Sequence, residues 1–400
     1  MQHRIVVLGA GYTGAVAAGR LARRLHREDV TITVVNPGPD FVERVRLHQV
    51  AAGQDLRPRP LGEVFAGTGV ELRLAKVTAL DVDRKTVTVA TAGSPEREEL
   101  EYDTLVYALG SGWDGGGVPG TAEHAHEVSS RPGALRLRAR LAALAAGRPV
   151  VVVGGGLTGL EAATEIAEAR PDLDVALVAR GALGDWLSEK GRAHLRKVVD
   201  GLGITVHEHT RVTAVEADAV TTDDGRTVPA EATVWTTGFA VHPIAQATTL
   251  ELADRGRIVV DATMRSVSHP DVYAVGDAAT ATGPGGRPLR MSCASGVPMA
   301  WQAADAIAAR LTGTKVPRVA IRYFQQCVSL GRGQGLIQFT TADDRAKDRV
   351  LTGRAAARYK ELICRGAAWG VANPTAGMPS RRRRVVRRET GSRARARAAV

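Results

Sequence analysis

The stretch VVLGAGYTGAVAA, Val6 to Ala18, recurs with the same glycine spacing as VVVGGGLTGLEAATE, Val151 to Glu165. Each copy joins an apolar run to a G-x-G-x-x-G turn and a segment of helical composition, and a second apolar run follows. This order predicts a strand, a tight turn, a helix and a parallel strand, twice in one chain. We therefore expect an α/β protein with two Rossmann-like dinucleotide-binding domains.

The three glycines of each turn have different physical roles. The first permits the tight turn, the second lets a pyrophosphate approach the backbone, and the third lets helix and strand pack closely. The N-terminus of the helix then offers free N–H groups to the phosphate. One such turn is a weak signal, but two in the expected setting predict two dinucleotide sites, at Gly9, Gly11 and Gly14 and at Gly154, Gly156 and Gly159.

Composition and length agree with a globular protein of several domains, because the 400 residues are 44% hydrophobic. No apolar run approaches the ~20 residues of a membrane-spanning helix. The first strand begins almost at the N-terminus and leaves no room for a signal peptide, so we expect a cytoplasmic location. Cys293, Cys327 and Cys364 form no C-x-x-C pair, so we expect buried thiols and no metal site.

The positive charge is concentrated at the C-terminus. Residues 381–400 contain nine arginines and one glutamate, and so carry most of the net charge of +11. A run of Arg, Ala, Ser and Gly cannot bury enough apolar surface to fold. We expect residues 380–400 to be a disordered tail.

Three more apolar runs end in glycine, which suits strand ends. They are YDTLVYALGS with Gly110, VWTTGF with Gly238, and DVYAVGDAA with Gly276 and Asp277. Together with the two glycine turns, these segments over residues 1 to about 370 resemble the flavoprotein reductases with two dinucleotide-binding domains. More narrowly, they resemble the type II NADH dehydrogenases, which are NADH:quinone oxidoreductases.

The resemblance implies FAD on the first domain and NADPH or NADH on the second. The implied FAD residues are Gly9, Gly11, Gly14, Asn36, Arg46, Gly110, Gly276 and Asp277, and the implied nicotinamide residues are Gly154, Gly156, Gly159, Arg180 and Gly238. Asp277 matches an aspartate that bonds the ribitol chain of FAD, with a helix-capping role as the alternative. The implied division is residues 1–124 and 239–310 for FAD, 125–238 for NAD(P)H, and 311–379 for a small α+β part.

Two positions depart from the usual pattern of such domains. The strand after the first turn ends in Asn36 where an acid would bond the adenosine ribose, which predicts weaker FAD binding. The matching strand of the second unit ends in Ala179 followed by Arg180. The missing carboxylate and the guanidinium favour a 2′-phosphate and thus NADPH. An arginine in a solvated loop is the alternative, since the nearest other cations are Lys190 and Arg192.

Glu161 is the candidate catalytic residue. It matches a family glutamate that approaches flavin and nicotinamide and orients the nicotinamide or relays a proton. The helix macrodipole alone also favours an acid in this first turn. Glu165, one turn further, is interpreted as a solvated or hinge residue. His48 is interpreted as part of an ordinary helix, although the neighbouring Arg46 and Gln49 match the flavin-facing region of the family.

The acceptor site is expected on the helix that contains PMAWQAADAIAA. Family members carry an Ala-Gln pair there, followed by a second alanine and a second glutamine. This chain keeps Gln302 and the small Ala304, but it has Trp301 for the first alanine and Ala306 for the second glutamine. The bulky indole of Trp301 and the absence of the second glutamine amide argue against a long-chain quinone as the electron acceptor. Simple packing of this helix is the alternative.

The C-terminal part is predicted to contain a hairpin over Tyr323–Phe339 and a helix over Arg354–Gly370. The helix would have Arg354, Arg358, Glu361 and Arg365 on one face and Ala355, Tyr359, Leu362 and Ala367 on another. We consider two interpretations of this helix. It contacts anionic lipid at the inner membrane surface, or it packs on the chain itself or on the partner in a homodimer.

We expect an FAD-dependent NAD(P)H:acceptor oxidoreductase. Hydride would pass from nicotinamide C4 to flavin N5, and the electrons then to a quinone or another small acceptor. A ferredoxin-type reductase and a redox tailoring enzyme of a small metabolite are the alternatives. A flavoprotein switch that binds nucleic acid through its basic tail is the alternative of another class, and it is disfavoured.

Overall fold

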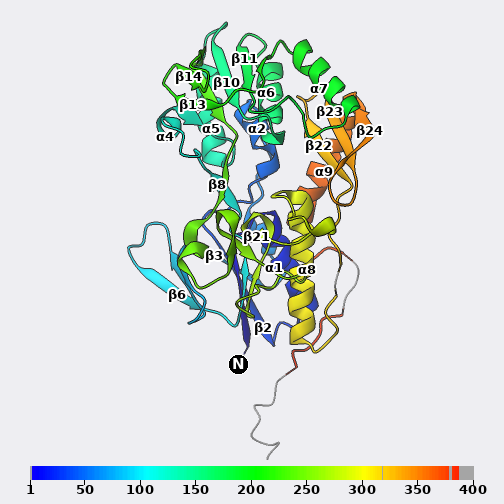
Figure 1. Cartoon of the computed structure of the whole chain (residues 1–400). Coiled ribbons are helices and arrows are strands. Elements are labelled where there is room, and N and C mark those ends of the chain that lie inside the picture. The colour runs from blue at the N-terminus through cyan, green and yellow to red at the C-terminus, as the bar shows by residue number, and fades with distance from the viewer. Residues whose placement is uncertain (1, 318, 378–380, 387–400) are drawn as a thin grey trace, which may run out of the picture.

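The computed structural model describes residues 2–317, 319–377 and 381–386. Figure 1 shows two lobes along one long axis, each built around one parallel sheet. This arrangement confirms the predicted α/β fold with two Rossmann-like units.

The first lobe contains a five-stranded parallel sheet in the order β20-β7-β1-β2-β3. Its strands are β1 (His3–Leu8), β2 (Val30–Asn36), β3 (Val70–Leu74), β7 (Thr104–Tyr107) and β20 (Val272–Ala274). Helices α1 (Tyr12–Arg24) and α8 (Cys293–Leu311) pack together, and Arg20 Nε lies 2.7 Å from Asp305 Oδ1 between them. The chain therefore returns to its first sheet after the second one is complete.

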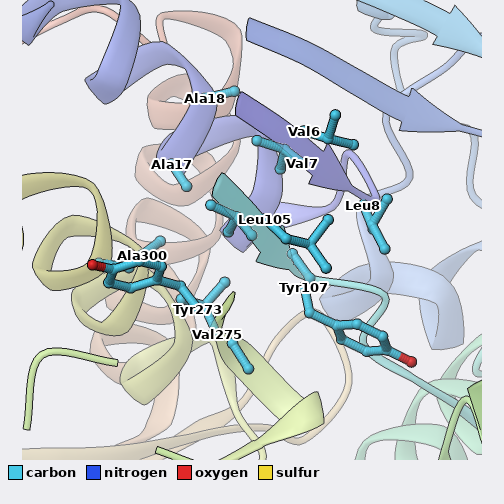
Figure 2. Packing of buried hydrophobic residues seen from close by; sticks show 14 of the residues in the cluster. Val6, Val7, Leu8, Ala17, Ala18, Leu105, Tyr107, Tyr273, Val275 and Ala300 are labelled. Atoms are coloured by element: carbon cyan, nitrogen blue, oxygen red, sulfur yellow. The ribbon is translucent and has the colours of Figure 1, made fainter. Parts of the chain in front are cut away.

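The central strands β1 and β7 and the strand β20 carry buried apolar runs, because both faces of a parallel sheet are covered there. Figure 2 shows Val6, Val7 and Leu8 of β1 beside Leu105 and Tyr107 of β7. Ala17 of α1 and Ala300 of α8 lie in the same cluster, and their small side chains suit the close approach of these two helices.

The second lobe repeats the design with the strand order β12-β11-β10-β16-β9. Its strands are β9 (Ala125–His126), β10 (Pro149–Val153), β11 (Asp174–Val178), β12 (Thr205–His207) and β16 (Ala232–Trp235). Its helices are α4 (Thr121–His124), α5 (Arg131–Ala143), α6 (Leu157–Ala169) and α7 (Glu189–Gly201). The short helix α2 (Leu47–Ala51) comes from the first part of the chain but packs here, against α5 and α6.

Smaller elements complete both lobes. Antiparallel strands β8 (Ser111–Trp113) and β17 (Phe239–Val241) pair where the chain enters and leaves the second lobe. The other small sheets are β4 (Lys76–Asp81), β5 (Thr86–Ala90) and β6 (Arg97–Glu101); β13 (Val212–Val215), β14 (Ala219–Thr222) and β15 (Thr227–Pro229); and β18 (Leu252–Ala253), β19 (Arg257–Val259) and β21 (Ala279–Thr280). The short helices are α3 (Leu61–Phe65), η1 (Arg44–Arg46), η2 (Pro243–Ala247), η3 (Asp254–Gly256), η4 (Gly276–Ala278) and η5 (Pro284–Gly286).

The C-terminal part forms a three-stranded antiparallel sheet and a long helix. The predicted hairpin is confirmed as β22 (Gln325–Ser329) and β23 (Gly335–Thr340), and β24 (Ala346–Thr352) adds a third strand. The predicted helix is α9 (Gly353–Ala372), but its predicted apolar face is wrong at Leu362, which is 65% exposed. Its buried side chains include Ala356, Cys364 and Val371, because the helix packs on the new sheet and on α1.

Residues 381–386, which were predicted to be disordered, contact the first lobe in the structure. Arg383 pairs with Leu25 as a β-bridge, and Arg384 Nη1 lies 2.7 Å from Glu28 Oε2 and 3.2 Å from Asp29 Oδ1. Acidic side chains after α1 thus hold the first arginines of the tail. Residues 387–400, to which the prediction of disorder also applies, lie outside the described residues.

Candidate functional site

The first glycine turn has the shape of a phosphate cradle. Gly9 adopts a φ of +93°, and a Cβ there would lie 2.6 Å from the carbonyl oxygen of Ala108. A Cβ on Gly14 would lie 1.9 Å from the oxygen of Gly9, so α1 can approach the strand only without a side chain. Gly11 instead faces open space, with no atom within 4 Å of a Cβ. Because Gly11 caps α1 with no side-chain hydrogen bond, the first N–H groups of the helix are left for an anion.

The second glycine turn repeats this geometry. Gly154 has a φ of +130°, and a Cβ on Gly159 would lie 1.8 Å from the oxygen of Gly154. Gly156 caps α6 and again faces open space. The residues of both turns therefore fit a dinucleotide pyrophosphate, in agreement with the two predicted sites.

Asn36 and Asp277 lie at the carboxyl ends of strands in the first lobe, where ligands of α/β sheets bind. Asn36 Oδ1 accepts a hydrogen bond from the N–H of Ala10 at 3.0 Å, and its Nδ2 donates to Gly38 at 2.7 Å. The amide thus holds the glycine turn itself, and its contact with a ribose stays a prediction. Asp277 Oδ2 accepts a hydrogen bond from Ser111 Oγ at 2.7 Å.

Arg44 is a residue of this region that the sequence did not single out. Its Nη2 lies 3.5 Å from Ser111 Oγ and its Nε donates to the Ser129 carbonyl at 3.1 Å, so it connects the two lobes. The predicted glycines Gly110, Gly238 and Gly276 all have a positive φ and lie directly after β7, after β16 and after β20.

Arg180 lies two residues beyond the end of β11 and is exposed. Within the described part of the chain its guanidinium has no ion-pair partner. Lys190 instead forms an ion pair with Asp348, with 3.0 Å between its Nζ and Asp348 Oδ2. Arg180 is therefore free to meet an anion at the second dinucleotide site.

Glu161 forms a buried ion pair that the sequence did not predict. Its Oε1 lies 3.0 Å from Lys360 Nζ on α9 and accepts a hydrogen bond from the Ser329 N–H at 3.0 Å. Burial alone would raise the pKa of Glu161, but Lys360 and the Ser329 N–H outweigh burial and lower the pKa below its ordinary value. Burial works to lower the pKa of Lys360, and the carboxylate of Glu161 outweighs it and raises that pKa. The pair is thus charged at neutral pH.

His48 and Glu165 also lie at this pair, and His48 lies in a helix as predicted. His48, on α2, is 4% exposed, and Glu165, one turn after Glu161, is 2% exposed, so the prediction of a solvated Glu165 is wrong. Burial lowers the pKa of His48 to about 4 and raises the pKa of Glu165 to about 7. The spacing of Glu161 and Glu165 by four residues could have indicated this, because such residues share a helix face.

Arg46 lies beside this cluster and connects α2 to α9. Its Nε donates to Gln49 Oε1 at 2.8 Å, and its Nη2 lies 3.2 Å from Glu361 Oε1. Glu361 also pairs with Arg332 at 2.9 Å and with Arg365 at 2.8 Å. The proposed contact of Arg46 with the flavin stays a prediction.

The two residues predicted to meet the acceptor lie apart from this cluster along α8. Trp301 is 46% exposed and lies under Arg20, 5.8 Å from its guanidinium carbon to the ring centroid. Gln302 is buried, and its Oε1 accepts a hydrogen bond from Val319 N at 3.2 Å while its Nε2 donates to the Pro317 carbonyl. These contacts favour a structural role for Gln302, and an acceptor contact for either residue stays a prediction.

The cysteines, far apart in sequence, lie in one region. Cys364 is buried and Cys293 and Cys327 are half-buried, and all three thiols are free. Burial raises the pKa of Cys293, on which the charges of Lys360, Glu161 and Asp277 all act. Cys293 is the first residue of α8, so this end of α8 experiences the charges of both lobes. Among the described residues no three His, Cys, Asp or Glu side chains form a metal-binding group.

Comparison with known proteins agrees with this geometry. A family model described as pyridine nucleotide-disulphide oxidoreductase matches residues 3–308. An NADH dehydrogenase-like protein of Mycobacterium tuberculosis is 32% identical over 321 residues, which cover 74% of this chain and 78% of that protein. A demethylphylloquinone reductase of Synechocystis is 28% identical over 292 residues, covering 69% and 72%. The structure of NDH2 from Plasmodium falciparum in complex with NADH shares the fold with a TM-score of 0.78 at 13% identity, covering 94% of this chain and 97% of that one.

Proposed function

Because this chain belongs to the pyridine nucleotide-disulphide oxidoreductase family, we propose that it oxidises NAD(P)H with a quinone as the electron acceptor. It is an FAD- and NAD(P)H-dependent oxidoreductase. The quinone is supported by the similarity to a demethylphylloquinone reductase. The observation that carries the proposal is the buried Glu161–Lys360 pair in a fold with two phosphate cradles.

The two cradles divide the cofactors between the lobes. We assign FAD to the turn of Gly9, Gly11 and Gly14, with Asp277 and Ser111 at its sugar chain, and the nicotinamide dinucleotide to the turn of Gly154, Gly156 and Gly159. Bound FAD supplies the two-electron chemistry, since it accepts a hydride equivalent and passes the electrons on. The chain itself contributes the orientation of both dinucleotides and a site that excludes water.

Glu161 and Lys360 are proposed to serve the acceptor side of the reaction. A reduced quinone must take up protons at its oxygens, and a charged, buried pair with few other partners can hold a proton donor at such an atom. The ammonium also stabilises negative charge that develops on a quinone oxygen. Glu161 and Lys360 are therefore assigned to charge and proton handling.

The proposed reaction is tested by comparing two acceptors in anaerobic steady-state assays. Menadione, a quinone, takes up electrons and protons, whereas ferricyanide takes up electrons only. We expect NAD(P)H oxidation with both. Turnover of ferricyanide without turnover of any quinone would contradict the quinone as acceptor and leave the reductase activity intact.

We propose that NADPH is the preferred donor, because Arg180 is exposed beside the second cradle and has no ion-pair partner among the described residues. The Arg180→Ala variant is expected to raise KM for NADPH about 10- to 100-fold, since a charge-assisted hydrogen bond contributes about 1.5–3 kcal/mol. KM for NADH should stay unchanged. An equal loss with both nucleotides would contradict this assignment.

The exposed side of α9 is proposed to contact an anionic membrane surface. In the described part of the chain no helix is long and apolar enough to span a bilayer. Trp369 is 60% exposed and Leu362 is 65% exposed. Leu362 also lines a groove of about 560 Å³, whose other lining residues are Arg332, Gly333, Arg354, Ala357, Arg358, Glu361 and Arg365. Exposed apolar and cationic side chains on one helix suit the headgroup region of anionic lipid.

Co-sedimentation with vesicles checks this contact. The protein should bind vesicles rich in phosphatidylglycerol at low salt, and Trp369→Glu should weaken binding several-fold because the indole loses its apolar burial and a negative charge is added. Binding that is equal for the variant, or equal for vesicles of phosphatidylcholine, would exclude α9 as the docking element.

A further inference from the structure

Four titratable side chains form a continuous line through the interior of the second lobe. From the inside outward they are Lys360, Glu161, His48 and Glu165. His48 Nδ1 lies 3.9 Å from Glu161 Oε2, and His48 Nε2 lies 4.0 Å from Glu165 Oε2. The imidazole thus presents one nitrogen to each carboxyl group.

The outer end of the line reaches the surface. Glu165 Oε1 accepts a hydrogen bond from the side chain of the half-buried Gln54, whose neighbours Gly53 and Asp55 are exposed. The inner end lies at the Glu161–Lys360 pair, where Lys360 Nζ also donates to the Cys327 carbonyl at 3.1 Å.

Two buried polar atoms of this line lack hydrogen-bond partners in the described part of the chain, which is unusual for a cluster with a purely structural role. His48 Nε2 and Glu165 Oε2 are buried and have no hydrogen-bond partner among the described residues. Most buried polar atoms are paired, because an unpaired one costs free energy. The two gaps exceed hydrogen-bond length, yet catalytic hydrogen bonds are often long before substrate binds.

The protonation states of the three outer groups, Glu161, His48 and Glu165, fit transfer between them. Burial lowers the pKa of His48 to about 4, so the imidazole is neutral near pH 7 and has one N–H and one free lone pair. Burial raises the pKa of Glu165 to about 7, so this carboxyl group carries a proton part of the time. Lys360 and the Ser329 N–H lower the pKa of Glu161, so Glu161 is deprotonated near pH 7 and holds a proton only in passing, on its way to a more basic quinone oxygen.

Other charges also face these groups. On His48 they are Glu161 from α6, Lys360 from α9, Arg332 from the β22–β23 loop and Arg46 from its own segment. On Glu165 they are Arg332, Glu168 and Glu161. The cations act on both groups without forming a hydrogen bond to either, so they adjust the proton affinities without closing the line.

We infer that His48 and Glu165 are positioning residues that deliver solvent protons to Glu161 during reduction of a quinone. The inference rests on the proposed function. NADPH and one solvent proton convert a quinone into a quinol and NADP⁺, because the transferred hydride brings both electrons and only one of the two protons. Glu165 gives a proton to Nε2 of His48, His48 releases the proton on Nδ1 to Glu161, and Glu161 passes it to the quinone oxygen. Solvent near Gln54 reprotonates Glu165, and the imidazole returns to its starting tautomer by rotation of the ring before the next turnover.

The test compares Glu165→Gln and His48→Gln with the wild type for menadione and ferricyanide. With menadione, wild-type kcat is expected to fall as pH rises through about 7, because Glu165 then loses its proton. Both variants should lose this limb and about tenfold or more of kcat, since neither amide can relay a proton. With ferricyanide, which needs no proton, both variants should match the wild type.

Controls separate this role from a structural one. Glu63→Gln makes the same chemical change at an exposed position of α3 and should leave both reactions unchanged. An unaltered menadione pH profile in both folded, flavin-containing variants would overturn the inference, and so would an equal loss with ferricyanide. If His48→Gln does not fold, Glu165→Gln decides. If the wild type reduces no quinone, dichlorophenolindophenol, which also takes up protons on reduction, replaces menadione.

Discussion

Replacing Lys360 with methionine is expected to lower the free energy of unfolding by about 3 kcal/mol, because it leaves the carboxylate of Glu161 buried without its cation. Methionine keeps the length of the aliphatic chain, so the loss of packing is small. Glu161 would keep the Ser329 N–H as a partner, which limits the effect. Denaturant unfolding of the flavin-loaded protein measures the change.

The pH dependence of this variant follows from the two pKa shifts. The pKa of Glu161 is lowered in the fold, so its contribution is present above the unfolded value of about 4.3 and is lost as pH falls. The pKa of Lys360 is raised, so its contribution is present below about 10.4 and is lost as pH rises. The difference between wild type and Lys360→Met should therefore be largest near neutrality and shrink in acid.

The double variant Lys360→Met, Glu161→Gln is the matched control. It removes both charges, and we expect it to recover part of the stability that Lys360→Met loses, because a neutral amide costs less to bury than an unpaired carboxylate. Two results would contradict the description of Glu161 and Lys360 as a buried ion pair. They are a Lys360→Met protein as stable as the wild type, or a double variant as unstable as Lys360→Met.

Gly14→Ala is expected to lower the stability of the protein, whereas Gly11→Ala is expected to weaken only the binding of FAD. A Cβ on Gly14 would lie 1.9 Å from the oxygen of Gly9, so alanine must push α1 from β1 and should destabilise even the flavin-free protein by several kcal/mol. A Cβ on Gly11 meets no atom within 4 Å, and the backbone φ of −72° suits alanine. This variant should fold normally but bind FAD at least about tenfold more weakly, because the methyl group fills the pyrophosphate cradle.

Two measurements separate these outcomes, namely thermal unfolding of the flavin-free proteins and FAD binding by fluorescence quenching. Gly38→Ala offers a matched control, because a Cβ there also meets open space, two residues beyond the end of β2. Normal FAD affinity of Gly11→Ala would refute the assignment of the first turn to FAD. A stable flavin-free Gly14→Ala would refute the close packing of α1.

The sequence predicted those features that depend on local backbone geometry. The two glycine turns, their strands and the helices that follow were predicted because the turn requires residues without a Cβ at fixed positions, and the glycine spacing shows those positions directly. The hairpin of β22 and β23 was likewise visible in its glycine-rich turn. The third strand, β24, was missed because AKDRVLT, in which five of the seven residues are exposed, lacks a buried alternating pattern.

The buried cluster could not be predicted in the same way. Lys360 lies among Arg358, Glu361 and Arg365 on α9, and nothing local distinguishes the one cation that points inward. His48 meets Glu161 only because α2 crosses into the second lobe, which is a property of the whole fold. Glu161 was identified through a resemblance, and its partner comes from a segment 199 positions away in the sequence.

An anaerobic absorbance titration tests the central claim most directly. The purified protein should show a flavin spectrum, and NADPH should bleach the flavin band at lower concentration than NADH. This result would support both dinucleotide assignments together with the role of Arg180. A protein that carries no flavin after reconstitution, or a flavin that neither nucleotide bleaches, would contradict the account.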